Sequence, residues 1–223
     1  MTKEEFEAKL KDSPFLVGDL VYQWLLDRIV TLDIKPGACL NESQLANHLG
    51  LSRTPVHSAL ERLQADGMVQ LRRGKKPIVS TLDISEYDAI ANLRAAVESK
   101  AASQAALLIT PTDITQLKKI TLDIERRQDS IVPYPLNDTA FHEIILQAAC
   151  NPYLQKAYEL YRIKLMRYRW FIFLSSPPTE QDYASRESVH RGLYLALKSH
   201  FPQQAAELAE LDATLMRHMV LGF

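Results

Sequence analysis

LANHLGLSRTPV, residues 45–56, has the pattern of two short helices joined at a glycine. Leu45, Ala46 and Leu49 predict an apolar stripe on the first helix. Asn41 is placed to cap that helix, because asparagine is a preferred N-cap residue. The glycine can supply the tight turn that follows. The stretch therefore predicts a helix-turn-helix.

The second helix of this pair is expected at residues 53–65. Ser52 is predicted to be its N-cap, and Pro55 falls in the first turn, where proline is tolerated. The positions expected to be buried recur at i, i+4 and i+7: Val56, Leu60 and Leu63. The positions expected to face outward are Arg53, Thr54, His57, Ser58 and Glu61. Outward residues at the start of such a helix are the ones that a recognition helix carries into a DNA major groove.

Further elements are predicted on both sides of the helix-turn-helix. A helix is expected at 17–32, and the first dozen residues are expected to be a mobile tail or a frayed helix. After Gly67, two short β-strands are predicted at 68–71 and 78–81, joined by the loop RRGKK at 72–76. A hairpin in this position is a wing, here with four positive charges at its tip. Contact with phosphates and a merely solvated turn both remain open for that loop.

Charge is distributed unevenly along the chain. The 223 residues are 47% hydrophobic and 24% charged, which is the composition of an ordinary globular protein. The net charge is −1, yet residues 50–80 carry six basic side chains against two acidic ones. A basic module on an acidic remainder is expected of a protein that touches nucleic acid with one end. Without a long apolar run or a signal peptide, we expect a cytoplasmic protein with no membrane partner.

The pattern after about residue 85 is helical throughout. Helices are expected at 86–109, 111–131, 136–149, 152–174, 180–199 and 202–220, with short connections. Helices of this length with short loops predict an antiparallel bundle. The predicted fold class is mainly α, with an N-terminal winged helix-turn-helix DNA-binding domain at 14–81 and a C-terminal all-helical domain at 86–223, to which the resemblance described next assigns effector binding and dimerisation.

Several stretches resemble a known family. IKPGACLNESQLANHLGLSRTPVHSALERLQADGMVQLRRG, residues 34–74, resembles the winged helix-turn-helix of GntR-type bacterial transcription regulators. LRAAVESKAA at 93–102 and DTAFHEIILQAACN at 138–151, together with His190, resemble the helical effector domain of the FadR/FCD subfamily. The resemblance implies a homodimer that binds a palindromic operator in double-stranded DNA. It also implies a small-molecule effector that enters the bundle, and it leaves open whether the output is repression or activation.

The resemblance assigns DNA contacts to the start of the recognition helix and to the wing. The residues are Ser52, Arg53, Thr54, His57, Arg73, Gly74 and Lys75. His57 departs from the family pattern, in which arginine usually stands at this position. A neutral imidazole has a single donor nitrogen, so His57 can donate fewer hydrogen bonds than arginine.

Asp138 and His142 are four residues apart and share one face of a predicted helix. On spacing alone, a buried hydrogen-bonded pair and part of a metal site are both open. In FCD domains of the metal-binding type, one aspartate and three histidines on three helices converge on a divalent ion. The resemblance carries these ligands onto Asp138, His142 and His190, with Asp212 where the family has histidine. Two carboxylates would favour Mn²⁺ or Mg²⁺ alongside Zn²⁺ or Ni²⁺.

Arg94 lies in the family's Leu-Arg-x₃-Glu motif, together with Glu98. A guanidinium beside a bound cation suits a carboxylate effector, which can bridge the two. An ion pair with Glu98 at i+4 is the alternative role of Arg94. The stretch of residues 168–171, Tyr168, Arg169, Trp170 and Phe171, could line the pocket or the dimer interface, and the sequence leaves both open.

A helical metallohydrolase fused to a winged module is the alternative function. An ion held by histidines and carboxylates can activate water. HEIIL at 142–146 begins like the HExxH motif but lacks its second histidine. GxSxG, Walker-type and GxGxxG motifs are absent from the sequence, and no general base remains once the ligands are assigned. The sequence therefore favours a ligand-responsive regulator that is not an enzyme.

Overall fold

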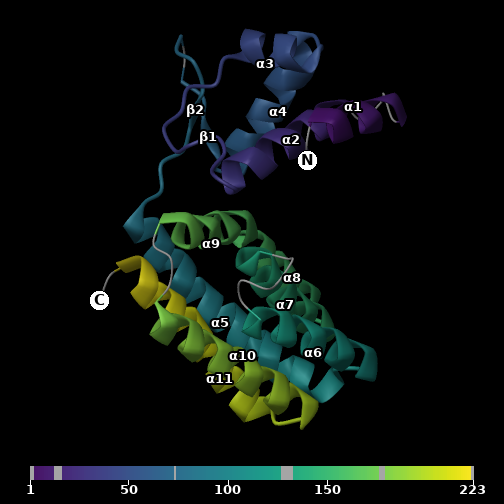
Figure 1. Cartoon of the computed structure of the whole chain (residues 1–223), viewed down its shortest axis with the longest axis vertical. Helices are drawn as coiled ribbons and strands as arrows, with labels where there is room; N and C mark the ends of the chain where they lie inside the picture. The colour runs from purple at the N-terminus through teal and green to yellow at the C-terminus, as the bar shows by residue number, and fades with distance from the viewer. Residues whose placement is uncertain (1–2, 13–16, 73, 127–132, 176–178, 222–223) are drawn as a thin grey trace. The chain divides into compact units, whose positions relative to one another are not determined.

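The computed structural model describes residues 3–12, 17–72, 74–126, 133–175 and 179–221. The chain divides into two compact units, residues 1–82 and 83–223 (Figure 1). Among the described residues, no helix combines the length and the apolar character that crossing a bilayer requires.

The first unit is a winged helix-turn-helix, as predicted. Its elements are α1 (Lys3–Asp12), α2 (Val17–Val30), α3 (Glu42–Leu49), α4 (Arg53–Ala65), β1 (Val69–Gln70) and β2 (Ile78–Val79). The two strands pair antiparallel, with Val69 opposite Val79 and Gln70 opposite Ile78. The recognition helix thus has the bounds expected from the sequence, and the basic loop connects the two strands of the wing.

Local signals set the turn between α3 and α4. The side-chain oxygen of Asn41 accepts hydrogen bonds from the backbone N–H groups of Ser43 and Gln44, at 3.0 and 3.2 Å. Gly50 has a φ of 67°, in the left-handed region that favours glycine. Ser52 occupies the N-cap position of α4, but its side chain makes no capping hydrogen bond. Both predicted N-cap positions are therefore confirmed, with side-chain capping bonds at Asn41 and none at Ser52.

Helix α4 buries its predicted stripe and packs against α2. The buried residues are Val56, Leu60 and Leu63, and the exposed ones are Arg53, Thr54, His57, Ser58 and Glu61. The positive charge of Arg62 on this helix already has partners within the first unit. Its guanidinium carbon lies 4.2 Å from the centroid of the Tyr22 ring, and the guanidinium pairs with Asp19, so Arg62 links α4 to α2.

Of the two alternatives expected for the N-terminus, the described residues form a helix, and the mobile tail is wrong for them. α1 is a helix of 10 residues, and the side chain of Phe6 is fully buried. The Phe6 ring lies 6.5 Å from the ring of Trp24 on α2 in an edge-on arrangement. A single aromatic side chain in a charged helix is too weak a pattern to reveal this docking from the sequence.

The second unit is a helical bundle, which confirms the mainly α class. Its helices are α5 (Ile84–Leu108), α6 (Pro111–Glu125), α7 (Tyr134–Ala148), α8 (Pro152–Glu159), α9 (Arg162–Ser175), α10 (Glu180–Lys198) and α11 (Pro202–Leu221). The long helix α5 packs along α11 and also contacts α7, α8, α9 and α10 (Figure 1). Side chains from these neighbours therefore meet around α5.

One predicted helix is divided in the structure. The segment expected to be continuous over 152–174 forms α8 and α9, with a turn at which the Tyr161 N–H donates to the Tyr158 carbonyl at 3.1 Å. Both tyrosines are buried, and their rings pack edge to face with centroids 5.3 Å apart. Neither proline nor glycine marks the break, so only the packing of the bundle accounts for it.

We predict that Asn41→Ala lowers the stability of α3 by about 1 kcal/mol, because two backbone N–H groups lose their acceptor. Hydrogen exchange of a peptide covering residues 42–50, followed by mass spectrometry, should accelerate about fivefold. Ser52→Ala is the matched control, since its side chain makes no capping bond. Exchange of α4 in that variant should change less than about twofold, and equal acceleration in both variants would contradict the capping assignment.

Candidate functional site

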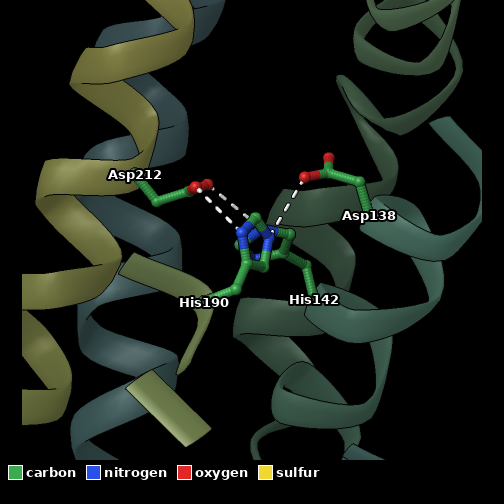
Figure 2. A group of neighbouring side chains, drawn as sticks. All are labelled: Asp138, His142, His190 and Asp212. Carbon is green, nitrogen blue, oxygen red and sulfur yellow. Dashed lines mark ion pairs between the residues drawn. The ribbon is translucent and has the colours of Figure 1, made fainter. Parts of the chain in front are cut away.

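Four side chains from three helices meet inside the second unit (Figure 2). Asp138 and His142 come from α7, His190 from α10 and Asp212 from α11. All four are buried, and one candidate ligand atom from each lies within 4.8 Å of those of the other three. The structure thus brings together every residue of the expected metal set.

Both imidazoles are oriented by a contact to the nitrogen that points outward. Nδ1 of His142 lies 2.9 Å from Oε2 of Glu98, and Nδ1 of His190 lies 2.9 Å from a backbone carbonyl oxygen of α10. Nε2 of His142 lies 3.2 Å from Oδ2 of Asp212. Nε2 of His190 lies 3.2 Å from Oδ1 of Asp138. Outer contacts of this kind fix the tautomer and the direction of metal-binding histidines.

The spacing of these atoms fits a small divalent ion. A tetrahedral ion with bonds of about 2.1 Å separates its ligand atoms by about 3.4 Å. That separation is close to the 3.2 Å measured in each imidazole–carboxylate pair. Within the described residues, Nε2 of His190 makes no hydrogen bond, although it faces a carboxylate oxygen. When the ring proton is on Nδ1, Nε2 and the carboxylate oxygen are two acceptors, and a cation between them would satisfy both.

Asp138 is held by two guanidinium groups. Nε of Arg169 lies 2.5 Å from its Oδ2, and Nη2 of Arg186 lies 3.5 Å from its Oδ1. Burial alone would raise the pKa of Asp138, but Arg169, His190 and Arg186 together outweigh burial and hold that pKa well below its usual range. Arg169 therefore lies inside the bundle, against a candidate ligand. Arg186 lies four residues before His190 on the same helix, which is the signal in the sequence that points to it. Such i, i+4 spacing is too common to single Arg186 out.

Arg94 lies beside Asp212, the second carboxylate of the candidate metal set. Its Nε donates to Oε1 of Glu98 at 3.0 Å, and its Nη2 donates to Oδ2 of Asp212. Burial alone would raise the pKa of Glu98, yet Arg94 and His142, with Arg169, together outweigh burial and lower that pKa to about 2. Burial alone would lower the pKa of His142, but the carboxylates of Glu98 and Asp212 together outweigh burial and raise it to about 9. The Arg94–Glu98 ion pair is therefore present, and this side of the site favours positive charge.

The buried charges around the site balance one another. Among the described residues, three carboxylates pair with three guanidinium groups: Glu98, Asp138 and Asp212 with Arg94, Arg169 and Arg186. The formal charge of these six side chains is thus zero. Any further cation in this space would leave a positive excess.

The first unit presents the start of α4 and the wing loop to solvent. The exposed residues are Ser52, Arg53, Thr54 and His57 on or before α4, and Gly74 and Lys75 in the loop. Arg73 lies outside the described residues. The ring of His57 lies between two carboxylates, 3.3 Å from Glu42 and 3.5 Å from Glu61. Each ring nitrogen of His57 therefore faces a carboxylate, Nδ1 that of Glu42 on α3 and Nε2 that of Glu61 on α4.

Two protein-family profiles match the chain. "Bacterial regulatory proteins, gntR family" matches residues 18–77, and "FCD domain" matches residues 89–219. The HTH-type transcriptional repressor RspR of Escherichia coli K12 is 28% identical over 169 residues, which are 74% of this chain and 73% of that protein. An uncharacterized HTH-type transcriptional regulator, YdfH of Escherichia coli O6:H1, is 28% identical over 179 residues, 78% of this chain and 77% of its own.

A likeness in fold extends over nearly the whole chain. The solved structure of E. coli McbR/YncC matches with a TM-score of 0.73 and 21% identity, covering 92% of this chain and 95% of that one. At this identity the match shows a common fold and nothing more specific.

We predict that Asp138→Asn destabilises the second unit by about 3 kcal/mol, because it leaves the buried charge of Arg169 without its carboxylate. Urea unfolding in a chelating buffer, followed by helical circular dichroism, measures this loss without a bound ion. Glu125→Gln is the control, because its partner Arg191 is exposed and such pairs contribute about 0–1 kcal/mol. Equal losses in the two variants would contradict a network held together by buried charge.

Proposed function

Because the chain belongs to the GntR family of bacterial regulatory proteins and carries an FCD domain, we propose that it is a homodimeric transcription regulator that responds to a small carboxylate. Residues 14–81 would form the DNA-binding domain, and residues 86–223 the effector-binding and dimerisation domain. The observation that carries the sensing role is the buried meeting of two carboxylates and two oriented imidazoles. The relatives are named transcriptional regulators, and no enzymatic activity is proposed.

The exposed start of α4 would choose the DNA sequence, and the wing would contact the backbone. Arg53 is well suited to a base edge in the major groove, where arginine can donate two hydrogen bonds to guanine. Lys75 on the wing is suited to a phosphate, which positions the protein without reading sequence. The other proposed contacts are Ser52, Thr54, His57, Arg73 and Gly74. The hydroxyl of Ser52 makes no capping bond, which supports its use in DNA contact.

A homodimer follows from the way that helix-turn-helix units read DNA. One recognition helix covers few base pairs, and dimers place two such helices on half-sites about one helical turn apart. A palindromic operator has the same twofold symmetry as the dimer. The effector would act by binding one arrangement of this dimer more tightly than another, since only a difference in affinity shifts an equilibrium.

We further propose that Asp138, His142, His190 and Asp212 hold one divalent ion, of zinc, nickel or manganese. The ion would supply a positive centre to which an oxygen anion can bind. The local charges support an anionic effector, because three buried guanidinium groups already balance the three buried carboxylates. A divalent ion leaves an excess of two positive charges, and a carboxylate offsets it. Arg94, whose guanidinium lies at the edge of the site, is the proposed contact for that carboxylate.

DNA binding gives the first test, with an operator selected from a pool of random duplexes. Arg53→Ala should weaken operator binding by about 1–3 kcal/mol and reduce the preference over random DNA. Lys75→Ala should weaken binding to both duplexes alike, because phosphates are common to both. Fluorescence anisotropy at fixed salt measures both effects. Lys198→Ala, an exposed lysine on α10, is the control, and the same loss on both duplexes for Arg53→Ala and Lys75→Ala would refute the division of roles.

Metal content gives the second test. Protein purified without a metal-affinity column should contain about one divalent ion per chain, and His190→Ala should lose it. His200→Ala is the control, because Nδ1 of His200 lies 2.7 Å from the Ala106 carbonyl oxygen, outside the four-residue set. A chelator should lower the unfolding temperature of the wild type and of the control but not that of His190→Ala. A wild type without metal, and indifferent to chelation, would contradict the metal site.

A further inference from the structure

Arg94 reaches from α5 into the candidate metal centre. Its Nη2 lies 3.0 Å from Nε2 of His142 and also contacts Oδ2 of Asp212. Nε2 of His142 and Oδ2 of Asp212 lie 3.2 Å apart and belong to two of the four candidate ligands. Nε of the same guanidinium donates to Glu98, so Arg94 is anchored at one end and meets the centre with the other.

A metal ion and the Nη2 end of Arg94 would both bind to Nε2 of His142 and Oδ2 of Asp212. An imidazole nitrogen has one lone pair in the plane of its ring. At Nε2 of His142, that lone pair can serve a metal ion, a proton or a hydrogen bond from Arg94, but only one of them at a time. A divalent ion in contact with a buried guanidinium would also be repelled strongly, because the interior screens charge poorly. Arg94 and a divalent ion are therefore alternative partners of His142 and Asp212.

Asp212 makes this exchange possible. Its carboxylate can accept a hydrogen bond from a guanidinium or bind a metal ion. A histidine at the same position could bind the ion but would not hold a guanidinium in an ion pair. The contact between Arg94 and Asp212 joins α5 to α11, the two helices that pack along each other in the bundle.

We propose that Arg94 takes the place of the cation in the ion-free protein, and that ion binding releases its Nη2 end for an anionic ligand. This inference rests on the metal site proposed above. The contact between Nε and Glu98 keeps the released end beside the centre. Ion and anion then bind with positive cooperativity, and each raises the affinity for the other by the same factor.

The wild-type protein provides the first test, with Mn²⁺ and acetate as probes. Free Mn²⁺ is followed by electron paramagnetic resonance and acetate binding by calorimetry on the full chain. We expect Mn²⁺ to tighten acetate binding at least about tenfold, and acetate to tighten Mn²⁺ binding by the same factor. Acetate affinity that does not depend on Mn²⁺ would overturn the inference.

Arg94→Met tests whether the coupling passes through this side chain. The variant removes the competing cation, so Mn²⁺ should bind at least about fivefold more tightly than in the wild type, and coupling to acetate should fall below about twofold. Mn²⁺ binding that is equal or weaker, or coupling of unchanged size, would overturn the inference. Arg191→Met is the matched control, because this exposed arginine pairs with Glu125, and both quantities should stay at wild-type values.

Asp212→His supplies a second variant in case Arg94→Met does not fold. It keeps Arg94 and removes the carboxylate that holds it, so acetate should bind without Mn²⁺ and coupling should again fall below about twofold. Coupling of wild-type size in this variant would overturn the inference. A wild type that binds no Mn²⁺ overturns the metal site and this inference together, whereas Mn²⁺ binding without coupling overturns only the role given to Arg94.

Discussion

The second unit depends on opposite charges that are buried together. A charge left without its partner inside the bundle would cost roughly 3–5 kcal/mol, so the helices must pack in a way that completes every pair. Asp138 ties α7 to α9 and α10 through Arg169 and Arg186, and Arg94 ties α5 to α11 through Asp212. The same requirement directs the two imidazoles toward the carboxylates. Structural support and a site able to bind ions are therefore provided by one set of residues.

The winged helix-turn-helix could be predicted because its signals lie close together in the sequence. Asn41, the left-handed Gly50 and the apolar stripe of α4 each act within one or two helical turns. The docking of Phe6 and the break between α8 and α9 could not be predicted in this way. Both depend on aromatic side chains that pack against distant parts of their own unit, and neither leaves a local pattern of caps, glycine or proline.

The candidate metal set could be predicted only in part from the residues themselves. Asp138 and His142 share a helix face, which their spacing shows directly. His190 and Asp212 lie on other helices, so their assignment came from the family resemblance. The contact between Arg94 and Asp212 joins residues 118 positions apart, and no periodicity in the sequence relates them. The packing of the bundle determines which arginines pair with the carboxylates of Asp138 and Asp212.

The side chain of Arg62 shows how the fold changes the meaning of a charge count. Its guanidinium lies over the Tyr22 ring and pairs with Asp19, so this positive charge already has a partner within the first unit. Counterions leave DNA only when cations of the protein replace them at phosphates. A plot of log affinity against log salt should therefore be shallower, by about one unit per chain, than the basic residues of 50–80 suggest. The affinity of the protein for DNA would therefore fall less with rising ionic strength than the number of basic residues alone suggests.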